Sequence, residues 1–266
     1  MNAIRIAADA ETRAGGALTW VAASLPATLE LVADNADVRA VSGAAGWTDR
    51  ANQALLEGAL GVVVVAPEAE PTDELRNTAA EQNAFVILDQ RWRSNPALTD
   101  AREAVSSIDA PISFIEISAN VSSLQDVDGA VHESVQIAHR VVGAVQDLRV
   151  LHRQSRTVLL SGSVAGGAPL TISIAVGPAI ERPFHLRVFA PSGAVHLSVP
   201  DPGTAAPAIV TVLSADGSTT LPNNWESAHR ASWRRVIAAF QRGDRPEDLH
   251  EFNAASQLLL SQASMS

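Results

Sequence analysis

The chain contains no lysine, no cysteine and no tyrosine, and all 19 of its Lys+Arg positions are arginine. Without lysine the protein cannot form a Schiff base, use a lysine acid or base, or build a P-loop phosphate site. Without cysteine and tyrosine it has no thiol nucleophile and no phenolic proton donor. The absence of cysteine also agrees with a reducing cytoplasm, where we expect the protein to work.

Charge and hydropathy exclude two further classes of partner. The formal net charge is -10 and there is no cluster of basic residues, so we expect neither nucleic acid nor an anionic membrane as a partner. The longest apolar run, at 61–67, is far too short to span a bilayer. The first ten residues have no basic segment followed by an apolar stretch, so we expect no signal peptide.

The first third of the chain alternates between strand and helix patterns. Strands are predicted at 4–8, 29–33, 38–42, 61–66 and 85–88, and helices at 14–24, 48–57 and 72–82. Thr48 is the expected N-cap of the second helix and Gly58 its end. The β-branched run GVVVVA at 61–66 is typical of a central parallel strand buried on both faces. This rhythm predicts a parallel sheet with helices on both sides.

The remainder is dominated by strand patterns. Strands are predicted at 112–118, 148–152, 157–164, 170–176, 184–189, 195–199 and 208–213, and helices at 132–145, 225–240 and 246–261. Turns rich in glycine, proline and serine separate these strands, which favours a mainly antiparallel sheet with one open face. We therefore expect a shortened Rossmann-like domain over 1–108 and an open-sheet α+β domain with C-terminal helices over 109–266, with the boundary near 105–111.

Several local patterns follow one another in a fixed order. They are GVVVVAP at 61–67, QRWRSNP at 90–96 with AREAV at 101–105, DGAVH at 128–132, and SWRRVIAAF at 232–240 with GDRP at 243–246. In this order they resemble the Gfo/Idh/MocA family, the relatives of glucose-fructose oxidoreductase and inositol dehydrogenase. The resemblance implies a Rossmann domain followed by a domain with a large open sheet, and it identifies 61–67 with the family's fourth strand.

Two family motifs are missing from this chain. The glycine-rich phosphate loop is replaced by Ala7-Ala8-Asp9-Ala10-Glu11-Thr12, which places two carboxylates where a pyrophosphate would bind. The catalytic Glu-Lys-Pro motif either aligns with Asp89-Gln90-Arg91 or, as we prefer, has been lost with its strand. We therefore expect no cofactor, with NAD(P) as the alternative. Asp34, after the second strand, is the candidate ribose-binding acid.

Asp128 and His132 are what remains of the family's site. They are spaced i, i+4 and so lie on one face of a helix start. The resemblance implies that His132 takes a sugar hydroxyl proton and that Asp128 positions the substrate; the alternative is a helix cap beside a groove-facing histidine. Nearby acidic residues and His139 suggest a metal, but His132 and His139 are two turns apart, so we expect none.

Arg91, Trp92 and Arg93 form a second candidate site, for substrate. In strand geometry the two arginines share a face opposite Trp92, where they can clamp a carboxylate, a phosphate or sugar hydroxyls. The alternative is a packed tryptophan with salt bridges between domains.

Two functions fit these observations. The preferred hypothesis is a non-catalytic pseudo-oxidoreductase that binds a sugar-like ligand or partners a catalytically complete homologue. The alternative is an active NAD(P)-dependent oxidoreductase that acts on a sugar or polyol through His132 and Asp128. In either case we expect the open face of the sheet to be covered, by a second copy of the chain or by a homologous catalytic subunit.

Overall fold

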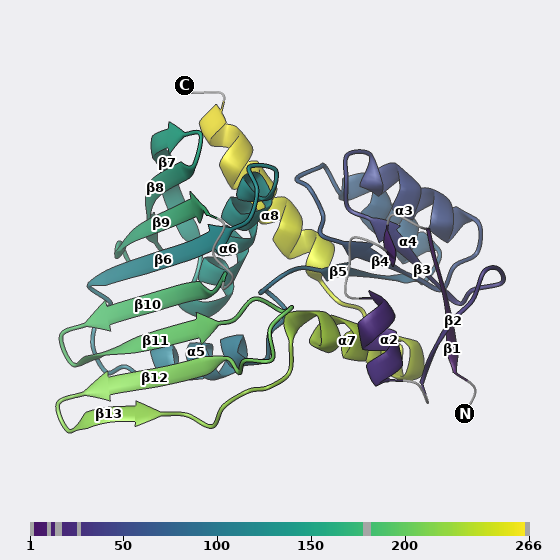
Figure 1. The fold of residues 1–266 in the computed structure, drawn as a ribbon. Helices are drawn as coiled ribbons and strands as arrows, with labels where there is room; N and C mark the ends of the chain where they lie inside the picture. Colours follow the sequence, from purple (N-terminus) through teal and green to yellow (C-terminus); the bar gives the residue numbers. More distant parts are fainter. Residues whose placement is uncertain (1–2, 10–11, 14–17, 26–27, 178–181, 264–266) are drawn as a thin grey trace. The chain divides into compact units, whose positions relative to one another are not determined.

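The computed structural model describes residues 3–9, 12–13, 18–25, 28–177 and 182–263 (Figure 1). It divides into two compact units. The first consists of Met1–Ser94 and Ala228–Ser256, and the second of Asn95–Ser227 and Gln257–Ser266. The first unit thus takes residues from both parts of the chain, whereas the expected division had a single boundary near 105–111. No described helix is long and apolar enough to cross a membrane.

The first unit is built on a five-stranded parallel sheet of order β2-β1-β3-β4-β5, as expected. The strands are β1 (Ile4–Ala8), β2 (Leu29–Leu31), β3 (Val38–Ser42), β4 (Gly61–Val65) and β5 (Phe85–Asp89). The helices are α2 (Leu18–Ser24), α3 (Trp47–Leu56), α4 (Asp73–Glu81), α7 (Ala228–Arg242) and the start of α8 (Asp248–Ala263). The first part of the expected helix at 14–24 lies outside the described residues.

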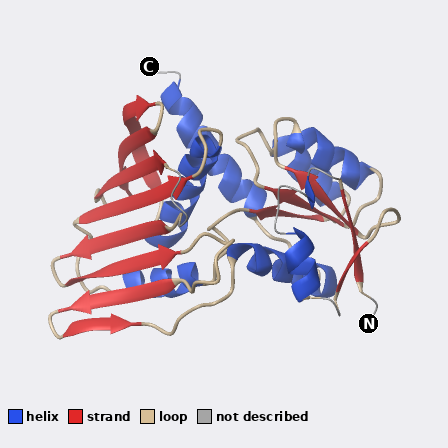
Figure 2. Ribbon diagram, viewed as in Figure 1, coloured by secondary structure: helices blue, strands red, loops and turns tan. Residues whose placement is uncertain are grey.

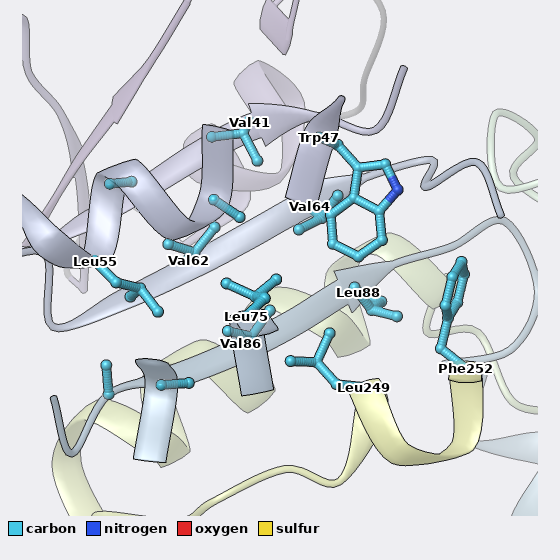
Figure 3. Close-up of a cluster of buried hydrophobic side chains, with 14 residues drawn as sticks. Val41, Trp47, Leu55, Val62, Val64, Leu75, Val86, Leu88, Leu249 and Phe252 are labelled. Carbon is cyan, nitrogen blue, oxygen red and sulfur yellow. The ribbon is translucent and has the colours of Figure 1, made fainter. Parts of the chain in front are cut away.

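Both faces of this sheet are buried, as the β-branched run of β4 predicts. Val62 and Val64 point into a core shared with α3, α4 and the first turns of α8, where the rings of Trp47 and Phe252 meet edge to face (Figure 3). Val63 points to the other side, into a core that includes residues of α2 and α7. A strand with apolar residues at successive positions therefore serves two cores at once.

The strand order shows where the sheet has been shortened. A six-stranded dinucleotide-binding sheet has the order 3-2-1-4-5-6, and removing its edge strand 3 leaves the order found here. The segment 32–37 links β2 directly to β3. This short link is possible because β2 ends opposite Ile6 of β1 and β3 begins opposite the same residue, so the chain has only to cross from one side of β1 to the other.

This order corrects our assignment of 61–67 to the fourth strand. β3, not β4, takes the place of the fourth strand, and β4 takes the place of the fifth. The strand absent from this order is therefore the edge strand, and the tripeptide Val65-Ala66-Pro67 follows at the end of β4. Ala66 has a positive φ of 52° and is exposed.

The second unit contains an eight-stranded sheet of order β13-β12-β11-β10-β6-β9-β8-β7. Its strands are β6 (Phe114–Val121), β7 (Val145–Gln154), β8 (Thr157–Val164), β9 (Pro169–Val176), β10 (Phe184–Ala190), β11 (Gly193–Val199), β12 (Ile209–Ser214) and β13 (Gly217–Thr220). All neighbours are antiparallel except β6 and β9, which confirms the mainly antiparallel sheet. The strand β13 was not expected from the sequence.

Two helices of this unit, α5 (Ala97–Ser106) and α6 (Asp126–Val142), pack on the same side of the sheet. They contact one another, and α6 lies on β6 to β9 while α5 lies on β11 and β12 (Figure 2). The alternation along β6 follows from this packing: Ile115, Ile117 and Ala119 are buried beneath the helices, while the residues between them lie on the open face.

Two helix starts differ from the sequence-based expectation. The N-cap of α3 is Gly46, with a φ of 77°, and not Thr48. The carboxylate of Glu70 explains the difference, since it accepts hydrogen bonds from the backbone N–H groups of Gly46 and Thr48 and from the Thr48 hydroxyl. A cap supplied by a distant residue leaves no local sequence signal. The helix α6 begins at Asp126, nearly two turns before the expected start at 132.

Candidate functional site

Asp128 and His132 lie in the first turns of α6, but the structure does not bring their side chains together. The His132 ring is buried, and its Nδ1 lies 2.9 Å from Nε2 of Gln136. The Asp128 carboxylate is exposed and forms a 2.6 Å ion pair with Arg153 of β7. The i, i+4 spacing thus places Asp128 and His132 on the same side of the helix. Their side chains nevertheless lie apart, because one pairs with Arg153 and the other with Gln136.

His132 belongs to a row of buried polar side chains on α6. Glu133 and Gln136 are also at least nine-tenths buried, and Oε1 of Gln136 has no hydrogen-bond donor. A buried acceptor without a donor is costly unless a ligand or water supplies one, so this row can receive a hydroxyl. Within the described ranges, no group of three or more His, Asp or Glu side chains is arranged to hold a metal ion.

The segment Arg91–Arg93 lies beyond the end of β5 and does not have the expected strand geometry. Trp92 is fully buried, and the guanidinium of Arg91 lies 5.5 Å from the centre of its ring. Arg93 is buried against α8, where it pairs with Asp248 (3.7 Å) and with Glu251. Arg93, Asp248 and Glu251 all belong to the first unit, so these two salt bridges are internal to it. Of the three residues, only Arg91 is partly exposed and so can contact a ligand from solvent.

The segment after β1 differs from a glycine-rich phosphate loop. Oδ1 of Asp9 accepts a hydrogen bond of 2.6 Å from the backbone N–H of Thr12. Ala10 and Glu11 lie outside the described residues. The carboxylate of Asp9 therefore accepts a hydrogen bond from a backbone N–H of the kind that binds the pyrophosphate at a helix start in a Rossmann fold. Asp34, the candidate ribose acid, lies exposed in the segment after β2.

A groove of about 570 Å³ runs over β1 and β3 beside α3. Its lining residues are Ala7, Ala8, Asp9, Ala33, Arg39, Ala40, Val41, Asp49, Arg50, Gln53, Ala54 and Glu57. The strand order reverses between β1 and β3, because β2 follows β1 on one side and β3 and β4 follow on the other, and ligands of open α/β sheets bind at such a switch point. Five of these residues are alanines, and their short side chains let a ligand come close to the backbone here.

Charged groups on the groove are partly committed to the protein. Arg50 donates hydrogen bonds to the carbonyls of Ser42 (3.0 Å) and Ala45 (2.9 Å), which holds the loop between β3 and α3. Arg39 lies 3.8 Å from Glu57, a long and exposed ion pair that an anionic ligand can replace at little cost.

The sequence analysis missed a carboxylate–imidazole pair at the carboxyl edge of the same sheet. Oδ1 of Asp89, the last residue of β5, lies 2.8 Å from Nδ1 of His229 in the first turn of α7. The side chain of Asp89 is 1% exposed and that of His229 is 18% exposed. An aspartate ending a buried strand was a visible signal, but nothing in the sequence pointed to a histidine 140 residues away.

Comparison with known proteins finds no matching family model and no matching curated protein. Solved structures do match. The chain is 14% identical to KijD10, a 3-ketoreductase from Actinomadura kijaniata in complex with NADP, with a TM-score of 0.76 over 99% of this chain and 97% of that one. The chain is 10% identical to the dehydrogenase MviM from Clostridium difficile, with a TM-score of 0.68 over 99% of each chain. It is 14% identical to GenD2 from gentamicin A biosynthesis, in complex with NAD, with a TM-score of 0.73 over 99% of this chain and 94% of that one.

The likeness is one of fold. It agrees with the expected Rossmann-like sheet followed by a larger mixed sheet and C-terminal helices. It also corrects our expectation that no cofactor is used, because proteins of this fold are solved with NADP and with NAD bound. That expectation rested on the missing glycine-rich loop and the missing lysine motif, and the sequence did not reveal the groove at the switch point.

The groove fits a nicotinamide dinucleotide in size and lining. Its volume lies within the range of small-molecule sites, and its lining combines six small or apolar residues with six polar or charged ones, of which Arg39 and Arg50 are cationic. Ala7, Ala8 and Arg39 are the residues that would hold the cofactor, with Asp34 near the end of β2 for ribose hydroxyls. The Asp9 carboxylate also lines the groove and already accepts the Thr12 N–H. A pyrophosphate would therefore not be bound here as it is by a glycine-rich loop.

Proposed function

We propose that this protein is an NAD(P)-dependent oxidoreductase that acts on a hydroxyl or keto group of a sugar or polyol. The observation that carries the proposal is the alanine-floored groove at the switch point of a parallel sheet. The shared fold with nicotinamide-bound proteins supports it. The cofactor would supply hydride transfer, and the chain's own residues would bind the substrate and move its proton.

The buried polar row of the second unit supports a role in substrate binding. Oε1 of Gln136, beside the buried ring of His132, has no donor in the described protein and suits a sugar hydroxyl. Arg91 is a further candidate for substrate contact in the first unit. We assign no substrate contact to Asp128, because Arg153 holds its carboxylate at the surface.

A second candidate function, a partner subunit without chemistry of its own, is favoured by Ala66. This residue stands where strand order places the family's catalytic lysine, and its methyl group cannot donate a proton. A protein of this kind would still bind the cofactor and a sugar, and would differ from the first proposal only in lacking turnover.

We also propose that the open face of the large sheet pairs with a second copy of the chain, the alternative partner being a homologous catalytic subunit. The rings of Phe114 and Phe189 stack on this face at 6.2 Å, and His196 meets Phe189 edge to face. Burial, together with nearby Arg187, lowers the pKa of His196, so this ring stays neutral at neutral pH. Sedimentation of the wild-type protein and of Phe189→Glu tests the pairing: we expect a dimer that the variant dissociates.

Calorimetric titration with NADP⁺, NADPH, NAD⁺ and NADH tests the main proposal. We expect at least one of them to bind with micromolar affinity. Ala8→Leu fills the groove and should weaken binding by about tenfold or more, or ~1.4 kcal/mol. Ala80→Leu is the matched control, because it places the same side chain in a second cavity of the first unit, about 580 Å³ between α4 and the start of α8. No heat with any of the four at millimolar concentration contradicts the proposal.

A further inference from the structure

The second cavity of the first unit, of about 580 Å³, lies between α4, the start of β5 and the segment that leads into α8. Its inner wall is apolar, because Ala79, Ala84, Val86 and Leu249 line it and also belong to the buried core cluster on this face of the sheet (Figure 3). The volume and the apolar wall are those of a small-molecule site.

This cavity is separate from the groove at the switch point. Phe85, the first residue of β5, lines the cavity and places it at the amino edge of the parallel sheet. The groove instead reaches Ala8 and Asp9, at the carboxyl end of β1. The two linings share no residue, so each can be filled without touching the other.

Arg245 brings a fixed positive charge to the cavity. Its guanidinium donates hydrogen bonds to the carbonyl oxygen and Oδ1 of Asn83, at 2.8 and 2.7 Å. It also donates to the carbonyl oxygens of Gly243 (3.0 Å) and Asp244 (3.2 Å). All four acceptors are neutral, and no carboxylate in the described part of the chain forms an ion pair with Arg245. The guanidinium is therefore held in one orientation while its charge stays unbalanced.

The remaining charges of the lining also favour an anion. Arg76 of α4 is the second cation, and its 2.8 Å pair with Asp73 is exposed at both ends, so an anion can compete for it at little cost. Glu247 is the one acidic side chain of the lining. Two arginines against one glutamate give this cavity a positive balance in a chain whose net charge is -10.

We propose that this cavity binds a small organic anion, with its carboxylate or phosphate group at Arg245 and Arg76 and its apolar body against the inner wall. Arginine is the side chain best suited to both head groups. Because Arg245 is already oriented, little conformational entropy is lost when the anion binds. Its bonds to Asn83 also fasten the loop to the end of α4, but fastening alone does not explain a cavity beside it. The proposal does not depend on the oxidoreductase function.

Saturation-transfer NMR with phenyl phosphate, benzoate and benzamide tests the site on the full chain. The three probes share one ring and differ in the head group. We expect at least one of the two anions to bind with a Kd below about 1 mM, and the neutral benzamide to bind at least about tenfold more weakly. The tighter of the two anions identifies the head group, and high salt should weaken its binding. No binding of either anion, or equal affinity for benzamide, overturns the proposal.

Two variants locate the bound anion. Arg245→Gln removes the fixed charge and should weaken binding by about tenfold, whereas Arg242→Gln, at an exposed arginine outside the cavity, should leave it unchanged. Ala80→Leu fills the cavity from an exposed position on α4, so it should weaken binding by at least about tenfold without disturbing the loop that Arg245 fastens. Wild-type affinity in either Arg245→Gln or Ala80→Leu overturns the proposal.

Ala8→Leu separates this proposal from the proposed function. It fills the groove at the switch point, so we expect it to weaken binding of NADP⁺ and to leave binding of the anion unchanged. Absence of all NAD(P) binding in the wild-type protein, with Arg245-dependent anion binding intact, contradicts the proposed function alone. Loss of anion binding in Ala8→Leu but not in Ala80→Leu would place the anion in the groove and overturn the second site.

Discussion

The carboxylate of Asp248 accepts a hydrogen bond of 2.9 Å from the backbone N–H of Leu88. This contact joins the first residue of α8 to β5, one residue before Asp89. Arg93 and Arg235 flank the same carboxylate, so a fully buried negative charge is balanced by two guanidinium groups. The strand end that carries the Asp89–His229 pair is thus held by an ion cluster formed from distant parts of the chain.

Removing the charge of Asp248 should destabilise the protein strongly. Asp248→Asn removes the buried anion that Arg93 and Arg235 share and leaves Arg93 only the half-exposed Glu251, and breaking a buried ion pair costs about 3–5 kcal/mol. Urea unfolding followed by circular dichroism measures the loss. Asp244→Asn is the control, since its exposed pair with Arg242 is worth at most about 1 kcal/mol. Equal stability of the two variants would contradict the assignment of Asp248 as the central anion.

The same carboxylate predicts a dependence of stability on pH. Burial raises the pKa of Asp248, but Arg93, Arg235 and the Leu88 N–H outweigh it, so the folded pKa lies below the usual value. A lowered folded pKa adds stability that is complete above the unfolded pKa, about 3.9, and is lost as pH falls through the folded pKa. We expect the free energy of unfolding of the wild type to fall more steeply below about pH 4 than that of Asp248→Asn. Parallel curves would refute this.

The charge of Asp9 should oppose cofactor binding. Asp9→Asn keeps a side-chain oxygen that accepts from the Thr12 N–H, because asparagine is as good an N-cap as aspartate, but it removes a negative charge near the pyrophosphate. We expect NADP⁺ to bind about three- to tenfold more tightly, with a smaller gain at high salt. Asp73→Asn, at an exposed ion pair on α4, should not change the affinity. Weaker binding by Asp9→Asn would mean that the pyrophosphate does not approach this end of the groove.

Gly43 should tolerate no side chain. A Cβ there would lie 2.4 Å from the carbonyl oxygen of Ala66 and from Cα of Pro67, and both are backbone atoms that cannot move aside cheaply. We expect Gly43→Ala to lower the free energy of unfolding by about 1–3 kcal/mol, as measured by thermal denaturation. Gly129→Ala, on the exposed side of α6 with nothing within 4 Å, should instead raise it by about 0.5–1 kcal/mol.

Much of the fold could be predicted because its signals are local. The run at 61–66 and the alternation in 112–118 specify how many faces of a strand are buried, and the structure has β4 covered on both faces and β6 on one. The strand order was a different matter. It depends on which strands lie side by side, and only that order showed that the absent strand is the edge strand and that β4 takes the place of the fifth strand.

The sequence by itself determined the classes of residue that this protein can use, and above all that no lysine, cysteine or tyrosine takes part. It also placed Asp128 and His132 on one side of a helix. Only the tertiary structure decided that Arg153 holds Asp128 at the surface while His132 is buried, and that Asp89 meets His229. The physical reason is range: helix and strand periodicity act over a few residues, whereas an ion pair or a hydrogen bond across 140 residues exists only after the chain has packed.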